Sequence, residues 1–189
     1  MSDRFRLHPQ QRALLALNVV GGIAVLGSYW AGFASNPESV GALWGGVPEW
    51  LRPAYTISMF SAAAGYFPFT LLLLFGLDPA KVRVAGHFGY GIFLLLTALI
   101  LVPSALWMPL TFLVIDAWDP ALWIAIRIVL ATVGLASLGL LASLVLLAPV
   151  TSRALHVAAI VGAIAFCVQT ALLDATVWTA YFPTGGIPS

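Results

Sequence analysis

Five long apolar stretches with almost no charges restrict what this sequence can fold into. They cover residues 13–33, 53–76, 84–106, 121–147 and 154–180. About 20 apolar residues are enough for an α-helix to cross the hydrocarbon core of a bilayer. The stretches are continuous rather than alternating, which excludes the pattern of a transmembrane β-barrel. The sequence therefore predicts an all-α integral membrane bundle of five transmembrane helices, folded as a single domain.

The composition excludes several other classes of protein. Apolar residues make up 61% of the 189 residues and charged residues only 8%, whereas soluble domains carry about 25% charged residues. A soluble globular enzyme, a nucleic-acid-binding protein with a basic patch and a disordered chain are therefore not expected. The net charge is +1 and there is one cysteine, so neither an intrachain disulfide nor a cysteine-cluster metal site is expected.

Lysine and arginine residues gather on one side of the predicted bundle. The N-terminal segment, the second loop and the fourth loop together carry Arg4, Arg6, Arg12, Lys81, Arg83 and Arg153. The loops on the other side carry only Arg52. Because basic residues are enriched in cytoplasmic loops, this asymmetry predicts a cytoplasmic N-terminus and a C-terminus on the outer side.

The tryptophans follow the opposite distribution, because all seven are predicted to lie on the outer side. They are Trp30, Trp44, Trp50, Trp107, Trp118, Trp123 and Trp178. One interpretation is an interfacial aromatic belt. The other is an aromatic-lined pocket near the outer face, covered by the loop 34–52, whose length is typical of a lid or binding loop.

Two charges inside the predicted spans are candidates for a functional role, because intramembrane charges are costly. Arg127 in the fourth span and Asp174 in the fifth are predicted to lie at similar depth. They could form a structural ion pair, or face a cavity and bind a polar ligand group or a proton. Asp116, with Asp174, is a candidate for acid–base catalysis. Asp119 precedes Pro120 and is expected to cap a helix.

Two histidines are predicted to lie at matched depth on the cytoplasmic side. His87 is expected at the start of the third helix and His156 at the start of the fifth. Such a pair could ligate one haem iron axially, but histidines at a membrane interface also serve as polar anchors. No other metal ligands and no other cofactor are expected.

Several short motifs resemble the TspO/MBR family of tryptophan-rich sensory proteins, which includes the translocator protein. The segment Trp44-Gly45-Gly46-Val47-Pro48-Glu49-Trp50-Leu51-Arg52-Pro53 is similar to the family's first loop. Leu106-Trp107-Met108-Pro109 matches a Leu-Trp-x-Pro-like segment, and Leu173-Asp174 stands where the family has Leu-Asn. The resemblance implies a five-helix fold with a pocket for a tetrapyrrole- or sterol-like ligand. That pocket would be lined by Trp44, Trp50, Tyr55 and Trp107.

These features leave more than one function open. The first hypothesis is a membrane protein that binds, senses or transports a small apolar ligand of tetrapyrrole, sterol or isoprenoid type. Its site would include Arg127 and Asp174 beside the aromatic residues. The alternatives are a membrane-embedded enzyme acting on a lipid or isoprenoid through Asp174, Asp116 or Arg127, and an accessory subunit of a membrane complex. A haem-bearing redox subunit is a fourth hypothesis, and a homodimer is compatible with any of them.

Overall fold

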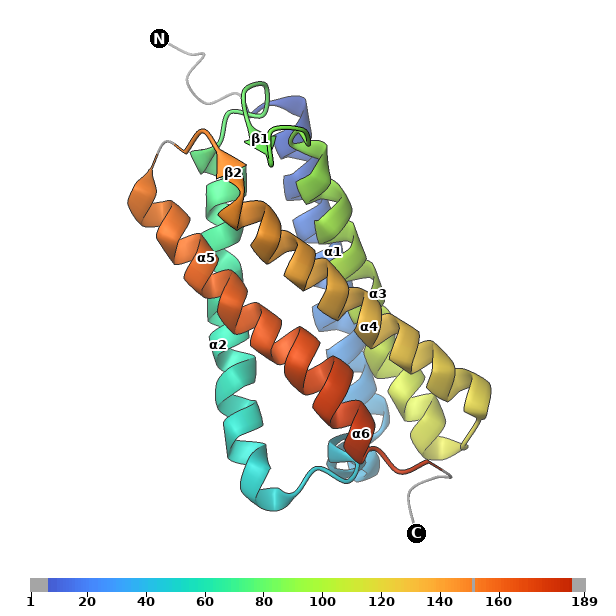
Figure 1. Ribbon diagram of the computed structural model, residues 1–189. Helices are drawn as coiled ribbons and strands as arrows, with labels where there is room; N and C mark the ends of the chain where they lie inside the picture. Colours follow the sequence, from blue (N-terminus) through green and yellow to red (C-terminus); the bar gives the residue numbers. More distant parts are fainter. Residues whose placement is uncertain (1–6, 151, 185–189) are drawn as a thin grey trace.

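Each apolar stretch forms a long helix in the computed structural model, which describes residues 7–150 and 152–184. Five helices are long and apolar enough to cross a membrane, namely Pro9–Ser35, Glu49–Gly76, Gly91–Asp116, Pro120–Val145 and Arg153–Tyr181. The predicted all-α membrane bundle is confirmed (Figure 1). Arg4 and Arg6, which contribute to the predicted orientation, lie outside the described residues.

Local capping explains where two of the helices begin. Helix α1 (Pro9–Ser35) starts with a proline, and the His8 side chain accepts a hydrogen bond from the Gln10 N–H. Helix α4 (Pro120–Val145) also starts with a proline, and the Asp119 carboxylate accepts hydrogen bonds from the N–H groups of Ala121 and Leu122. The capping role predicted for Asp119 is therefore confirmed.

The first long loop is ordered as short helical turns rather than as an open strap. It contains the 3₁₀ helices η1 (Pro37–Trp44) and η2 (Glu49–Leu51). Helix α2 (Arg52–Leu71) follows and continues into the π-helix η3 (Leu72–Gly76). The loop therefore packs as a cap on the end of the bundle where the fifth span ends at Tyr181 (Figure 1).

The third helix differs from its predicted limits of 84–106. Helix α3 runs from Gly91 to Asp116, because the preceding residues are taken up by a two-stranded pairing. Strand β1 (Arg83–Val84) pairs antiparallel with β2 (Leu147–Ala148). A turn with positive φ at Ala85 and Gly86 follows. At the other end the helix continues through Pro103 and Pro109, since membrane helices tolerate proline where neighbours satisfy the freed carbonyls.

The fifth span combines three helical segments. Helix α5 (Arg153–Cys167) continues as the π-helix η4 (Val168–Trp178) and ends in α6 (Thr179–Tyr181). This span packs against α2 and α4, and α3 packs between α1 and α4. Helix α1 contacts the second span mainly through η3, at the end of the bundle where α1 begins (Figure 1). Midway, the Tyr66 hydroxyl donates a 2.7 Å hydrogen bond to Asn18 Oδ1.

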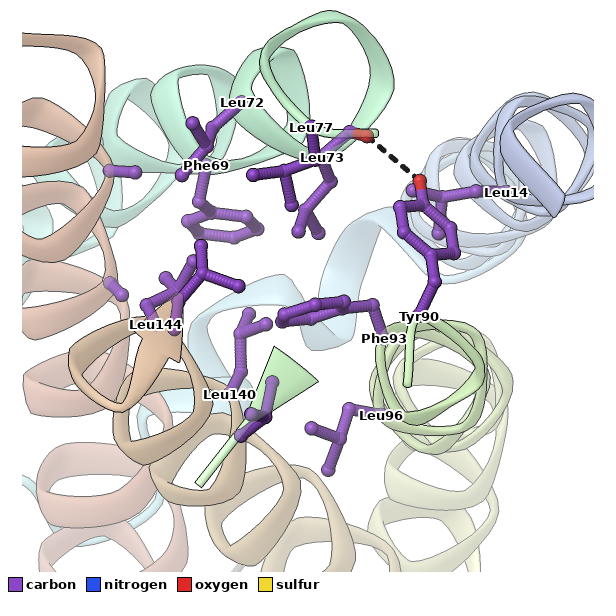
Figure 2. Close-up of a cluster of buried hydrophobic side chains, with 14 of the residues drawn as sticks. Leu14, Phe69, Leu72, Leu73, Leu77, Tyr90, Phe93, Leu96, Leu140 and Leu144 are labelled. Carbon is purple, nitrogen blue, oxygen red and sulfur yellow. Dashed lines mark hydrogen bonds between the residues drawn. The ribbon is translucent and has the colours of Figure 1, made fainter. Parts of the chain in front are cut away.

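The buried side chains form two clusters at opposite ends of the bundle. Figure 2 shows the one near the chain's N-terminus, where leucines surround Phe69 and Phe93. The Tyr90 hydroxyl there donates a 2.8 Å hydrogen bond to the Leu73 carbonyl. The second cluster is mainly aromatic and includes Trp123, Trp178 and Phe182. The leucine-rich cluster stabilises the fold, and the aromatic cluster surrounds the candidate site described below.

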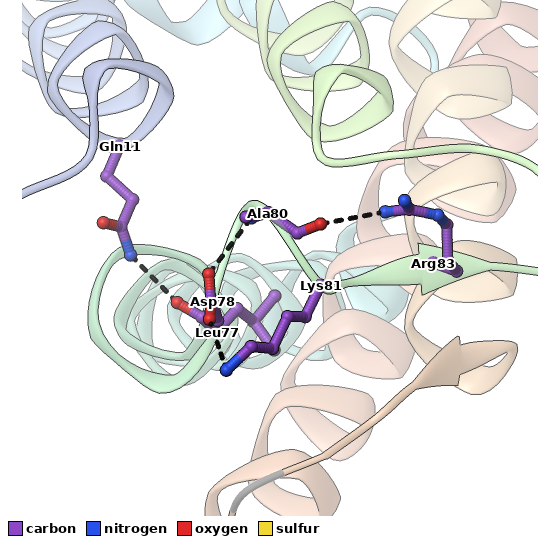
Figure 3. Close-up of polar contacts among 6 residues, drawn as sticks. All are labelled: Gln11, Leu77, Asp78, Ala80, Lys81 and Arg83. Carbon is purple, nitrogen blue, oxygen red and sulfur yellow. Dashed lines mark hydrogen bonds and ion pairs between the residues drawn. The ribbon is translucent and has the colours of Figure 1, made fainter.

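The loop between η3 and β1 is fixed by polar contacts (Figure 3). The Gln11 amide donates hydrogen bonds to the carbonyls of Leu74 and Leu77 at 2.8 and 3.1 Å. The Ala80 N–H and the Lys81 ammonium both contact the Asp78 carboxylate, and they hold its pKa below the usual value. These contacts tie the start of α1 to the end of the second span.

Candidate functional site

Five polar or aromatic side chains from four helices meet inside the predicted outer third of the bundle. Tyr29 lies near the end of α1, Tyr55 near the start of α2 and Trp107 in α3, while η4 supplies two more. We refer to this set as the interior polar cluster, which consists of Tyr29, Tyr55, Trp107, Gln169 and Asp174. It brings together three predicted site residues, namely Tyr55, Trp107 and Asp174.

The π-helix explains why Gln169 and Asp174 face each other. Its i→i+5 hydrogen bonding places residues five apart on nearly the same side of the helix, which an α-helix does not do. The Gln169 amide nitrogen donates a 2.8 Å hydrogen bond to Asp174 Oδ1. π-helical segments are frequent at functional sites, and this one contributes Gln169 and Asp174 to the cluster.

Gln169 leaves one buried polar atom without a partner. The residue is 6% exposed, and its amide oxygen is buried and makes no hydrogen bond within residues 7–150 and 152–184. Asp174 lies deep within the bundle, yet part of its surface remains accessible. The cluster therefore contains, among the described residues, a hydrogen-bond acceptor with no donor beside a partly exposed carboxylate.

Trp107 supplies the complementary unpartnered atom. Its indole N–H is buried and makes no hydrogen bond with any described residue, although the Trp178 N–H donates to the Leu43 carbonyl at 2.9 Å. The Trp107 ring lies 5.9 Å from the Tyr29 ring and 5.8 Å from the Trp178 ring, measured between centroids. A free donor is thus held between aromatic side chains on three helices.

The two tyrosines complete the cluster. The Tyr55 hydroxyl donates a 2.8 Å hydrogen bond to the Leu173 carbonyl, which joins α2 to η4 next to Asp174. The Asp174 carboxylate is close enough to the Tyr29 and Tyr55 hydroxyls for its charge to act on both. Gln169 and the two tyrosines therefore lie around Asp174.

The tryptophans divide into two groups. Five of them belong to the aromatic cluster, namely Trp44, Trp107, Trp118, Trp123 and Trp178. Their rings pack on one another and on Phe182, which lies 5.1 Å from Trp123 and 4.7 Å from Trp178 between ring centroids. Trp30 and Trp50 are 75% and 76% exposed and do not join the cluster. Trp50 is therefore not placed beside the other predicted ligand-binding residues.

Arg127 and Asp116 lie apart from Asp174. Arg127 is exposed and lines a shallow groove of about 340 Å³ with Ile124, Ile128, Ala131 and Ala175. It forms no ion pair with Asp174, so the first of the two alternatives left open by the sequence, a structural ion pair, is not observed. Asp116 is exposed in a different groove, of about 360 Å³, between α1 and α3. The acid, base and anion clamp of the enzyme hypothesis are not brought to one site.

The two histidines do not form the arrangement expected of haem ligands. His87 is exposed in the turn before α3 rather than at the start of that helix. His156 lies 2.7 Å from the Leu144 carbonyl through its Nε2 atom. Within residues 7–150 and 152–184, no group of three or more His, Cys, Asp or Glu side chains could hold a metal ion.

Sequence reasoning missed two members of the cluster. Gln169 is a polar residue in the middle of an apolar span, and that signal could have drawn attention to it. Its pairing with Asp174 depends on the π-helix, and no sequence pattern predicted that π-helix. Tyr29 stands beside Trp30 in the sequence, but only one of these neighbours points into the bundle.

The fold defines a class, namely multi-pass all-α membrane proteins, and at one end of the bundle it encloses polar groups among aromatic rings. Comparisons with family models, with curated proteins and with solved structures each found no match. The resemblance to the TspO/MBR family stays a prediction that rests on the short sequence motifs alone.

Proposed function

We propose that this chain binds a small, largely apolar molecule inside the predicted outer end of its helix bundle. The polar part of the ligand would lie against Trp107, Gln169 and Asp174. The observation that carries the proposal is the pair of buried, unpartnered atoms, the Trp107 indole N–H and the Gln169 amide oxygen. A ligand with an acceptor for the Trp107 N–H and a donor for the Gln169 oxygen would satisfy both atoms.

An energetic argument supports a ligand at this position. Leaving a buried donor or acceptor without a partner costs about 1–3 kcal/mol. The lipid core supplies no water to satisfy such groups. A ligand that bonded to both atoms would recover this cost, and the surrounding rings would contact its apolar part.

The sequence motifs point to the same residues. Trp107 belongs to the Leu-Trp-x-Pro-like segment and Asp174 to the Leu-Asp pair, which are two of the three motifs that carry the TspO/MBR resemblance. We therefore retain ligands of tetrapyrrole, sterol or isoprenoid type as first candidates. Binding, sensing and transport all begin with such a site.

We also propose that the N-terminus is cytoplasmic and the C-terminus lies outside. Arg12, Lys81, Arg83 and Arg153 all belong to the end of the bundle where α1 begins. Positive residues favour the cytoplasmic side. In this orientation the interior polar cluster lies toward the outer face.

The proposal is tested by titrating the detergent-purified protein with a porphyrin, a sterol and an isoprenoid while tryptophan fluorescence is followed. We expect saturable quenching by at least one ligand. Trp107→Phe should weaken binding about fivefold or more, because the N–H that would bond the ligand is gone. Trp30→Phe is the matched control, since Trp30 is exposed and outside the cluster. It should leave the affinity unchanged.

The opposite result would count against a ligand-binding role. If protein that is shown to be folded gives no saturable response to any of the three ligands, the accessory-subunit hypothesis becomes the better one. Equal weakening in the Trp107→Phe and Trp30→Phe variants would place any binding on the outer surface of the bundle.

A further inference from the structure

The carboxylate of Asp174 has no cationic partner in the described part of the chain. Among the described residues, its only hydrogen bond comes from the Gln169 amide. Arg127 forms no ion pair with it and faces the groove beside α4 instead. Arg52 pairs with Glu49 and lies 5.6 Å from the centre of the Trp44 ring. Asp174 therefore holds an acidic group in the bundle with nothing of opposite charge beside it.

An isolated carboxylate at this depth is unfavourable. Buried charges in proteins are normally paired, and charged residues within membrane spans face a partner, a cavity or a pathway. One amide hydrogen bond does not replace a counter-charge. The position is therefore suited to a positively charged group of a bound ligand.

The aromatic rings in and next to the interior polar cluster match the recognition of an organic cation. Tyr29, Trp107 and Trp178 present aromatic rings next to one another, with centroid separations of 5.9 and 5.8 Å. Aromatic faces attract ammonium groups through cation–π interactions, most strongly where water is excluded. The unpartnered Gln169 oxygen is an acceptor for an N–H donor of the same group.

We propose that the ligand of this site carries a protonated amine on an apolar body, with Asp174 as its counter-ion. This inference rests on the function proposed above and narrows the ligand to a class. The ammonium would donate hydrogen bonds to Asp174 and to the Gln169 oxygen. The Trp107 N–H would bond an acceptor on the body of the ligand, and the neighbouring rings would contact its apolar surface.

The test compares two probes that differ in charge, anthracen-9-ylmethylamine and anthracen-9-ylmethanol. At neutral pH the first is an ammonium and the second is neutral, while the ring system is the same. Binding to the purified protein is followed by energy transfer from tryptophan to anthracene, and the saturable part is isolated by competition with excess probe. We expect the amine to bind about tenfold more tightly than the alcohol, or better.

Two variants separate the role of Asp174 from general effects of charge. Asp174→Asn keeps the size and can still accept the Gln169 hydrogen bond, but it removes the charge. It should abolish the preference for the amine, because it should weaken binding of the amine far more than binding of the alcohol. Asp116→Asn is the matched control, because Asp116 is an exposed carboxylate on the same predicted side. It should keep the preference.

The outcomes distinguish this inference from the proposed function. If the wild-type protein binds the alcohol as tightly as the amine, or if Asp174→Asn keeps the preference, the cation inference is wrong while ligand binding stands. The wild-type comparison decides this even if the Asp174→Asn variant does not fold. If neither probe binds saturably, and no porphyrin, sterol or isoprenoid does so, the proposed function itself fails.

Discussion

At the scale of single residues, Gln11 links two spans that otherwise hardly meet. It is 7% exposed, and its amide satisfies two carbonyls at the π-helical end of the second span. Its side-chain oxygen also accepts a hydrogen bond from the His8 N–H at 3.0 Å. One side chain thus caps α1 and completes the hydrogen bonding of η3.

We expect Gln11→Ala to lower the stability of the bundle by about 1–3 kcal/mol, because buried carbonyls at the end of η3 would lose their donor. Thermal unfolding of the detergent-solubilised protein, followed by circular dichroism, measures the change. Gln10→Ala is the matched control, since the Gln10 side chain makes no hydrogen bond with the described residues. Similar losses in the two variants would contradict a specific role for Gln11.

At the scale of elements, α2 and α5 cross at glycines that let their backbones touch. A Cβ atom on Gly65 would lie 2.5 Å from the Gly162 carbonyl oxygen and 2.9 Å from its Cα. These neighbours are backbone atoms, so they cannot move aside as a flexible side chain could. Small residues at such crossings allow membrane helices to pack closely.

Gly65→Ala should therefore destabilise the protein by about 1–3 kcal/mol through overpacking at this crossing. Gly27→Ala provides the control within another span, because a Cβ on Gly27 would meet nothing within 4 Å. Apparent melting temperatures in one detergent give the comparison. A Gly65→Ala variant as stable as the wild type would show that the α2–α5 crossing can adjust at no cost.

At the scale of the whole molecule, the sidedness of the chain can be tested through its cysteine content. Cys167 is buried and is the only cysteine in the sequence, so a Cys167→Ala background carries no thiol. Ala80 and Ala117 are both exposed, in loops at opposite ends of the bundle. Each can accept a single cysteine for labelling.

In intact cells, a membrane-impermeant maleimide should label the Ala117→Cys variant. It should reach the Ala80→Cys variant only after permeabilisation. This result is expected because the loop at 80 lies on the side rich in lysine and arginine, which we assign to the cytoplasm. Labelling in the reverse order would invert the orientation and place the interior polar cluster toward the cytoplasm.

The sequence alone determined the membrane class and the number of helices, because continuous apolar runs leave a chain in lipid few alternatives to helices. It also brought out Trp107 and Asp174, which stand out by residue type. It misplaced the third helix, since the pairing of Arg83–Val84 with Leu147–Ala148 joins segments far apart in the chain. Only the tertiary structure shows that Arg127 does not pair with Asp174 and that Gln169 lies beside that carboxylate. Which side chains meet depends on helix rotation and on the π-helical turn, and neither is encoded in local hydropathy.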